Sequence, residues 1–83
     1  MTLYEFNILS FEEKQAIVHD IGIFLDNYVT TDIRINCYAI DKFFVELVYN
    51  SEFNTITEVR SFKCGHEMEK YSPDIFKYFK TNL

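Results

Sequence analysis

The sequence predicts an α+β fold of two layers, in which a three-stranded antiparallel sheet packs against one long helix and a short C-terminal helix follows. Three observations predict it. Apolar residues recur with a helical period over residues 11–28, apolar and polar residues alternate over much of residues 31–63, and a second helix start stands at Ser72. A chain of 83 residues has the length of one domain, so we expect residues 1–83 to fold as a unit.

The long helix is expected over residues 11–28, after a capping box in which Ser10 and Glu13 each accept a backbone N–H from the other. Its apolar residues form one broad stripe, the pattern of a helix that packs on a sheet. The stripe consists of Ile17, Val18, Ile21, Phe24, Leu25 and Tyr28. Gly22 costs about 1 kcal/mol relative to Ala in a helix interior. We interpret it as a point of close packing against a strand, with a hinge or a ligand contact as the alternative.

Two runs with period-two alternation between residues 33 and 49 predict a β-hairpin. A two-residue turn would place Cys37 opposite Glu46 and leave both sheet faces mixed. A three-residue loop places Cys37 opposite Val45 and makes one face wholly apolar, so we predict the three-residue loop. Lys42 then takes a left-handed conformation that glycine adopts more easily.

A third strand is expected over residues 55–63, which are rich in Thr and Val. Its register is open. Placing Arg60 opposite Glu46 leaves Ile56 on the outer face unless a bulge turns it inward.

The two ends of the chain give weaker signals. Residues 1–7 are expected as a frayed tail or a short extra strand, and residues 66–71 as one or two helical turns. The short C-terminal helix begins with Ser72 as its cap and Pro73 at its first helical position.

Composition limits the function classes. The net charge is −5, which argues against direct nucleic-acid binding because that binding rests on neutralising phosphates. The sequence has neither a stretch of about 20 apolar residues that would span a membrane nor a secretory signal at its start. Cys37 and Cys64 have no disulfide-framework spacing, so we expect a reduced, cytoplasmic protein.

No group of residues predicts catalysis. Four zinc-ligand types are present, at His19, Cys37, Cys64 and His66, but their predicted positions do not converge. A thiol of Cys64 activated by His66 is the enzyme hypothesis, and the sequence offers no third group or oxyanion hole for it. We therefore predict no catalytic, cofactor-binding or metal-binding residues and no small-molecule site.

The outer sheet face, turned away from the long helix, is the strongest candidate for a function. Aromatic and apolar side chains are expected there around two arginines and a glutamate, a composition typical of protein interfaces. The candidate interface consists of Arg34, Tyr38, Phe44, Glu46, Val48, Arg60 and Phe62. The alternative is that the C-terminal helix folds across this face and buries it.

The chain resembles small uncharacterised bacterial proteins with a helix, a hairpin, a further strand and a short C-terminal helix. Phe43-Phe44-Val45-Glu46 and the helix start Leu9-Ser10-Phe11-Glu12-Glu13-Lys14 carry the resemblance. Lys42 departs from the glycine expected at that turn. The resemblance implies no activity.

The sequence therefore favours a non-enzymatic, cytoplasmic protein-interaction module that uses the outer sheet face to bind a protein partner or a second copy of itself as a homodimer. The alternative is an acidic decoy or inhibitor. It would present the carboxylates of residues 11–28 to a basic or nucleic-acid-binding protein.

Overall fold

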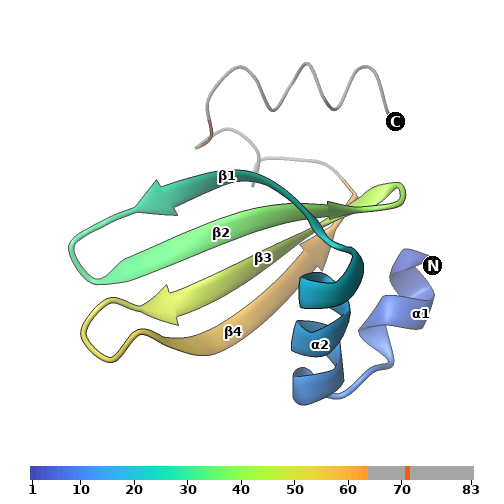
Figure 1. Ribbon diagram of the computed structural model, residues 1–83, viewed down its shortest axis with the longest axis horizontal. Coiled ribbons are helices and arrows are strands. Elements are labelled where there is room, and N and C mark those ends of the chain that lie inside the picture. The colour runs from blue at the N-terminus through green and yellow to red at the C-terminus, as the bar shows by residue number, and fades with distance from the viewer. Residues whose placement is uncertain (64–70, 72–83) are drawn as a thin grey trace.

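In the computed structural model, which describes residues 1–63 and residue 71, two short helices precede a four-stranded antiparallel sheet. The elements are α1 (Leu3–Asn7), α2 (Phe11–Ile21), β1 (Ile23–Val29), β2 (Ile33–Ile40), β3 (Phe43–Asn50) and β4 (Thr55–Phe62). The strands lie in chain order, β1-β2-β3-β4, and α2 crosses one end of the sheet (Figure 1). The predicted α+β class is confirmed, and the predicted three-stranded sheet is wrong. The helices expected after residue 63 lie outside the described residues.

The helix predicted over residues 11–28 ends at Ile21, and Gly22 explains why. Gly22 leaves the helix with φ −71° and ψ 138°, while its N–H still donates to the carbonyl of Val18 at 2.9 Å. A Cβ atom on Gly22 would lie 2.4 Å from that carbonyl oxygen, so a side chain does not fit without a backbone shift. The close contact expected of Gly22 is therefore with its own helix and not with a strand.

Residues 23–29 form β1 instead of the second half of the helix. Their apolar positions fit a helical period, but the stretch Ile-Phe-Leu-Asp-Asn-Tyr-Val is also rich in β-branched and aromatic residues. As a strand it pairs antiparallel with β2, with Phe24 opposite Tyr38 and a bulge at Leu25. The pairing extends the sheet to a fourth strand.

Residues 1–7, expected as a tail or a strand, contain the helix α1. Thr2 and Glu5 form a capping box, in which the Glu5 N–H donates to the Thr2 hydroxyl and the Thr2 N–H donates to the Glu5 carboxylate. Phe6 is fully buried and its ring packs on that of Phe43, with centroids 5.5 Å apart. A local cap and one buried aromatic residue thus fix this short helix on the sheet.

The β2–β3 hairpin has a two-residue turn, so the predicted three-residue loop is wrong. Ile40 pairs with Phe43 and Cys37 with Glu46. Asp41 takes the positive φ, 50°, that we had expected for Lys42. The prediction assumed that only one face of the sheet is buried, and this assumption fails.

The register of β4 is the one in which Arg60 lies opposite Glu46. A bulge beside Tyr49 turns Ile56 onto the face that the helices cover, which resolves the alternative left open by the sequence.

Both faces of the sheet carry a hydrophobic cluster. The helix face, covered in part by α1 and α2, has a core that consists of Phe6, Val18, Ile40, Phe43, Val45 and Leu47. The opposite face, which we call the Tyr71 face, has a core that consists of Cys37, Ala39, Phe44, Phe62 and Tyr71. The register of the hairpin places both apolar and polar residues on each face. Because both faces are buried, few apolar residues of the hairpin are exposed to water.

Candidate interaction surface

The hairpin register divides the predicted interface between two faces. Phe44, Glu46, Val48, Arg60 and Phe62 share the Tyr71 face, as their cross-strand pairs show. Arg34 and Tyr38 lie on the helix face, opposite Tyr49 and Val45. The prediction that all seven residues share one face is therefore wrong, because a register shift of one residue moves every β2 side chain to the other face.

Most of the predicted interface residues on the Tyr71 face are buried. Phe44 and Glu46 have no exposed surface, and Val48 and Phe62 are less than a tenth exposed. Tyr71 packs against Phe44 and Phe62 as part of the same cluster. A partner could reach these side chains only by displacing what covers them.

Glu46 is a carboxylate within this buried cluster. The Tyr71 hydroxyl donates a hydrogen bond to Glu46 Oε2 at 2.5 Å. On the other side, Arg60 Nη1 lies 3.8 Å from Glu46 Oε1, and Arg60 Nε donates to Glu58 at 2.6 Å. Burial, and then the bond to Glu46, raise the pKa of the Tyr71 hydroxyl, so it stays protonated as a donor at neutral pH. The bond to Glu58 raises the pKa of Arg60, which remains a cation.

The exposed apolar surface gathers elsewhere, on β1. Ten large hydrophobic residues are exposed in the described part of the chain, and five of them fall within residues 21–29. We call these five the edge patch. It consists of Ile21 (46% exposed), Ile23 (56%), Phe24 (55%), Tyr28 (36%) and Val29 (61%). β1 is an end strand of the sheet, so the patch lies along an edge.

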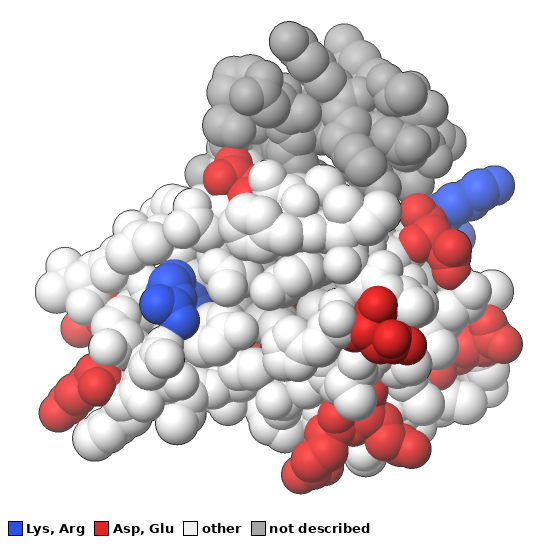
Figure 2. All heavy atoms as spheres, viewed as in Figure 1, with Lys and Arg blue, Asp and Glu red and all other residues white. Residues whose placement is uncertain are grey.

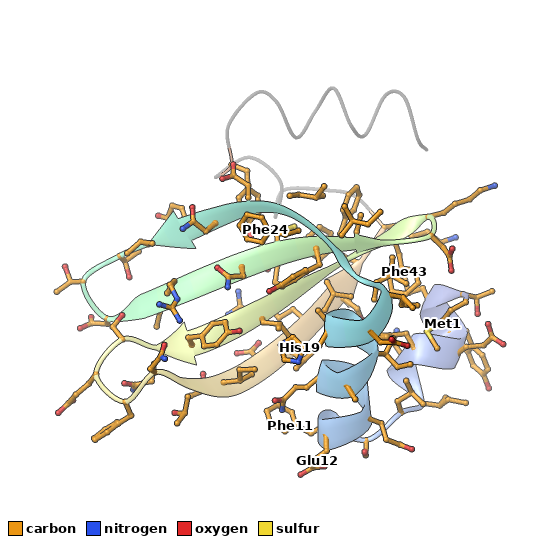
Figure 3. The ribbon with its side chains drawn as sticks, in the orientation of Figure 1. Met1, Phe11, Glu12, His19, Phe24 and Phe43 are labelled. Carbon is orange, nitrogen blue, oxygen red and sulfur yellow. The ribbon has the colours of Figure 1, made fainter. Side chains whose placement is uncertain are left out.

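The edge patch continues onto both faces of the sheet. Phe24 and Val29 pair with Tyr38 and Arg34 on the helix face, whereas Ile23 pairs with Ala39 on the Tyr71 face. Figure 3 shows Phe43 beside α1 and Phe24 farther along the sheet, on β1. The helices therefore leave the β1 side of the helix face open.

Aromatic contacts hold the helix-face part of the edge patch in place. The Phe24 and Tyr38 rings meet edge to face with centroids 5.7 Å apart. The Arg34 guanidinium lies 4.7 Å from the centre of the Tyr49 ring. Partial burial is the main reason that the pKa of Tyr38 is raised, so its hydroxyl is neutral at physiological pH. An ordered aromatic surface loses less entropy on binding than a flexible one.

Acidic residues outnumber basic ones around the edge patch. Asp20 lies at the end of α2, Asp26 in β1 and Asp32 in the turn after β1, and residues 15–33 contain no Lys or Arg. Asp26 accepts the N–H of Asn27 at 2.8 Å. Figure 2 shows acidic side chains mainly toward the outline of the face in view, with a basic side chain on the left part of that face. The surface thus combines an apolar strip with mainly acidic neighbours, and Arg34, which pairs with Val29, is a cation beside it.

The sequence reasoning missed the edge patch because it assigned Ile21, Phe24 and Tyr28 to the buried stripe of a helix. Two signals could have found it. Glycine is common at the ends of helices, which makes Gly22 a candidate end point. The β-branched and aromatic composition after it favours a strand. A strand at this point of the chain must lie at a sheet edge or extend the meander, and here it does both.

The alternative chemistries receive no support from the described residues. Residues 1–63 and 71 contain no group of three or more His, Cys, Asp and Glu side chains that could hold a metal ion. A hollow of about 540 Å³ lies between α1 and the β2–β3 turn, and its walls include Lys42 and Lys63 but no His or Cys. Cys64 and His66, the pair of the enzyme hypothesis, lie outside the described residues.

In residues 1–63 and 71, no helix has the length and apolar character needed to cross a membrane. Comparison of the chain with protein families, curated proteins and solved structures finds no match.

Proposed function

We propose that this chain is a small, non-enzymatic protein-interaction module that binds its partner through the edge patch. One observation carries the proposal. Half of the exposed large hydrophobic residues in the described part of the chain lie on or beside one edge strand. Such residues lose contact with water when a partner covers them, and full burial of a large apolar side chain contributes about 1.5–3 kcal/mol.

The edge patch fits the role better than the face predicted from the sequence. Natural edge strands are commonly blunted by lysine, proline or a bulge. β1 has the bulge at Leu25 but neither Lys nor Pro, and it leaves Phe24 and Val29 more than half exposed. A homodimer through the Tyr71 face would require Phe44 and Glu46 to become accessible, which costs the contacts of Tyr71 described above.

We also place the protein in the cytoplasm. The buried thiol of Cys37 supports this location. It packs as a small core residue, a role that does not depend on the disulfide chemistry of an oxidising compartment.

A second candidate function is that of an acidic decoy that binds a basic protein. Ten acidic residues against five Lys and Arg among residues 1–63 favour it, since that part of the chain has a net charge of 5 − 10 = −5. The two functions respond differently to salt. Exposed charge pairs are screened at moderate ionic strength, whereas apolar contacts persist.

Affinity capture from cell extract with two variants tests the proposed function. Phe24→Ser removes an aromatic ring from the edge patch, and Phe53→Ser removes a ring that is 69% exposed in the β3–β4 turn, outside the patch. We expect proteins retained by the wild type and by Phe53→Ser to be lost with Phe24→Ser, and to remain bound at moderate salt. Equal retention by both variants would contradict the edge patch, and loss of all binding at moderate salt would favour the decoy.

A further inference from the structure

β1 offers backbone hydrogen bonds as well as apolar side chains. It pairs with β2 on one side, and within the described part of the chain no strand pairs with its other side. An edge strand of this kind presents a row of N–H and C=O groups to an incoming chain. β1 has seven residues, enough for a ladder as long as the average strand of about five or six residues.

The side chains of β1 suit an added strand. Ile23 and Tyr28 stand on the Tyr71 face, and Phe24 and Val29 stand on the helix face. An extended segment that joined this edge would bring its alternate side chains beside one pair or the other, because successive side chains of a strand point to opposite faces. Apolar side chains on either face of the added segment would then be partly covered by the apolar side chains of β1 on that face.

The charges disfavour a second copy of the chain as the occupant of this edge. Two copies joined at this edge would each bring three acidic residues near it, Asp20, Asp26 and Asp32, against one neighbouring cation, Arg34. Like charges that face each other across a strand pair are destabilising.

We infer that the occupant is an extended, basic segment of a partner protein, which adds to β1 as a fifth strand. This inference rests on the proposed function and specifies its partner. Backbone pairing with the edge gives affinity, and apolar side chains pack on Phe24 and Val29. Lys or Arg toward the ends of the segment complement Asp20 and Asp32, which lie beyond the two ends of β1.

A selection from a library of random peptides of about 12 residues, long enough for one strand, tests the inference on the full-length protein. We expect the enriched peptides to alternate apolar and other residues and to carry Lys or Arg near their ends. Enrichment of acidic, proline-rich or helix-forming peptides, or of none, would overturn the inference.

Backbone methylation of the best peptide supplies the second readout. In an added strand, alternate N–H groups point toward β1, and the others point away. Methylation of one alternate set should abolish binding, whereas methylation of the other set should leave it within about threefold, less than 1 kcal/mol. Equal tolerance of both sets would overturn the strand geometry.

Protein variants complete the experiment. Phe24→Ser should weaken peptide binding at least about tenfold, as expected for loss of a buried ring, and the control Phe53→Ser should not. Asp20→Asn with Asp32→Asn should weaken it about three- to tenfold at low salt. If no peptide binds while capture of a cellular protein still depends on Phe24, the inference fails and the proposed function stands. If neither occurs, both fail.

Discussion

Glu46 is the only charged side chain that is buried in the described part of the protein. Its carboxylate is fully buried in the Tyr71 face, and transfer of such a group out of water costs several kcal/mol. The Tyr71 hydroxyl and the Arg60 guanidinium offset that cost from two directions. The contact also joins residues 25 positions apart in the sequence, so it fixes where Tyr71 sits on the sheet.

Replacement of Tyr71 by Phe should lower the free energy of unfolding by about 1–3 kcal/mol. The ring would still pack on Phe44 and Phe62, but the buried carboxylate would lose its hydroxyl donor. Urea unfolding of the purified variant measures the change.

Glu46→Gln supplies the control for Tyr71→Phe. The amide still accepts from the Tyr71 hydroxyl and carries no charge, so Tyr71→Phe should cost less in the Glu46→Gln background than in the wild type. Equal costs in the two backgrounds would show that the hydroxyl does not act through Glu46.

At the scale of elements, the sequence predicted the helices and strands that local signals determine. It failed where pairing with a neighbouring strand determines the secondary structure. The capping box of Ser10 and Glu13 places the start of α2, and the alternation over residues 33–49 places β2 and β3. The stretch after Gly22 fits two periods at once, so only its pairing with β2 makes it a strand. The edge patch was missed for the same reason. The residues of β1 are exposed in a strand, but they would be buried as the apolar stripe of a helix.

The hairpin register depends on the face that each strand must bury. The sequence argument sought one wholly apolar face, and the protein instead buries Cys37 and Ala39 on one side and Val45 and Leu47 on the other. No property of the hairpin alone separates these two arrangements. The second layer that decides between them includes Tyr71, far along the chain.

Glycine substitutions in the β2–β3 turn test this register directly. Asp41 has φ 50°, a conformation that glycine adopts without the steric cost of a side chain. Asp41→Gly should therefore be more stable than Lys42→Gly by about 1 kcal/mol, measured by thermal or urea unfolding. The three-residue loop predicts the reverse order, because it places Lys42 in the left-handed conformation.

At the scale of the whole molecule, residues 1–63 and 71 bury much of both sheet faces and include no strand that pairs with the outer edge of β1. Helices cover part of the helix face, and Tyr71 packs on the other. The β1 edge keeps its exposed apolar residues, with Asp26 within β1, Asp20 at the end of α2 before it and Asp32 in the turn after it. In the proposed binding mode, the acidic residues at this edge would both oppose pairing between copies and favour a basic partner.

Removal of two of these charges should allow the edge to pair with itself. In Asp20→Asn with Asp32→Asn, each copy brings one acidic residue of this group, Asp26, to a contact between two β1 edges in place of three. Light scattering on a size-exclusion column at low salt should show a monomer for the wild type and a monomer–dimer equilibrium for the double variant. Addition of Phe24→Ser should return the double variant to a monomer, because that change removes apolar contact from the new interface. A wild type that already dimerises in a Phe24-dependent way at low salt would show that the aspartates do not protect the edge.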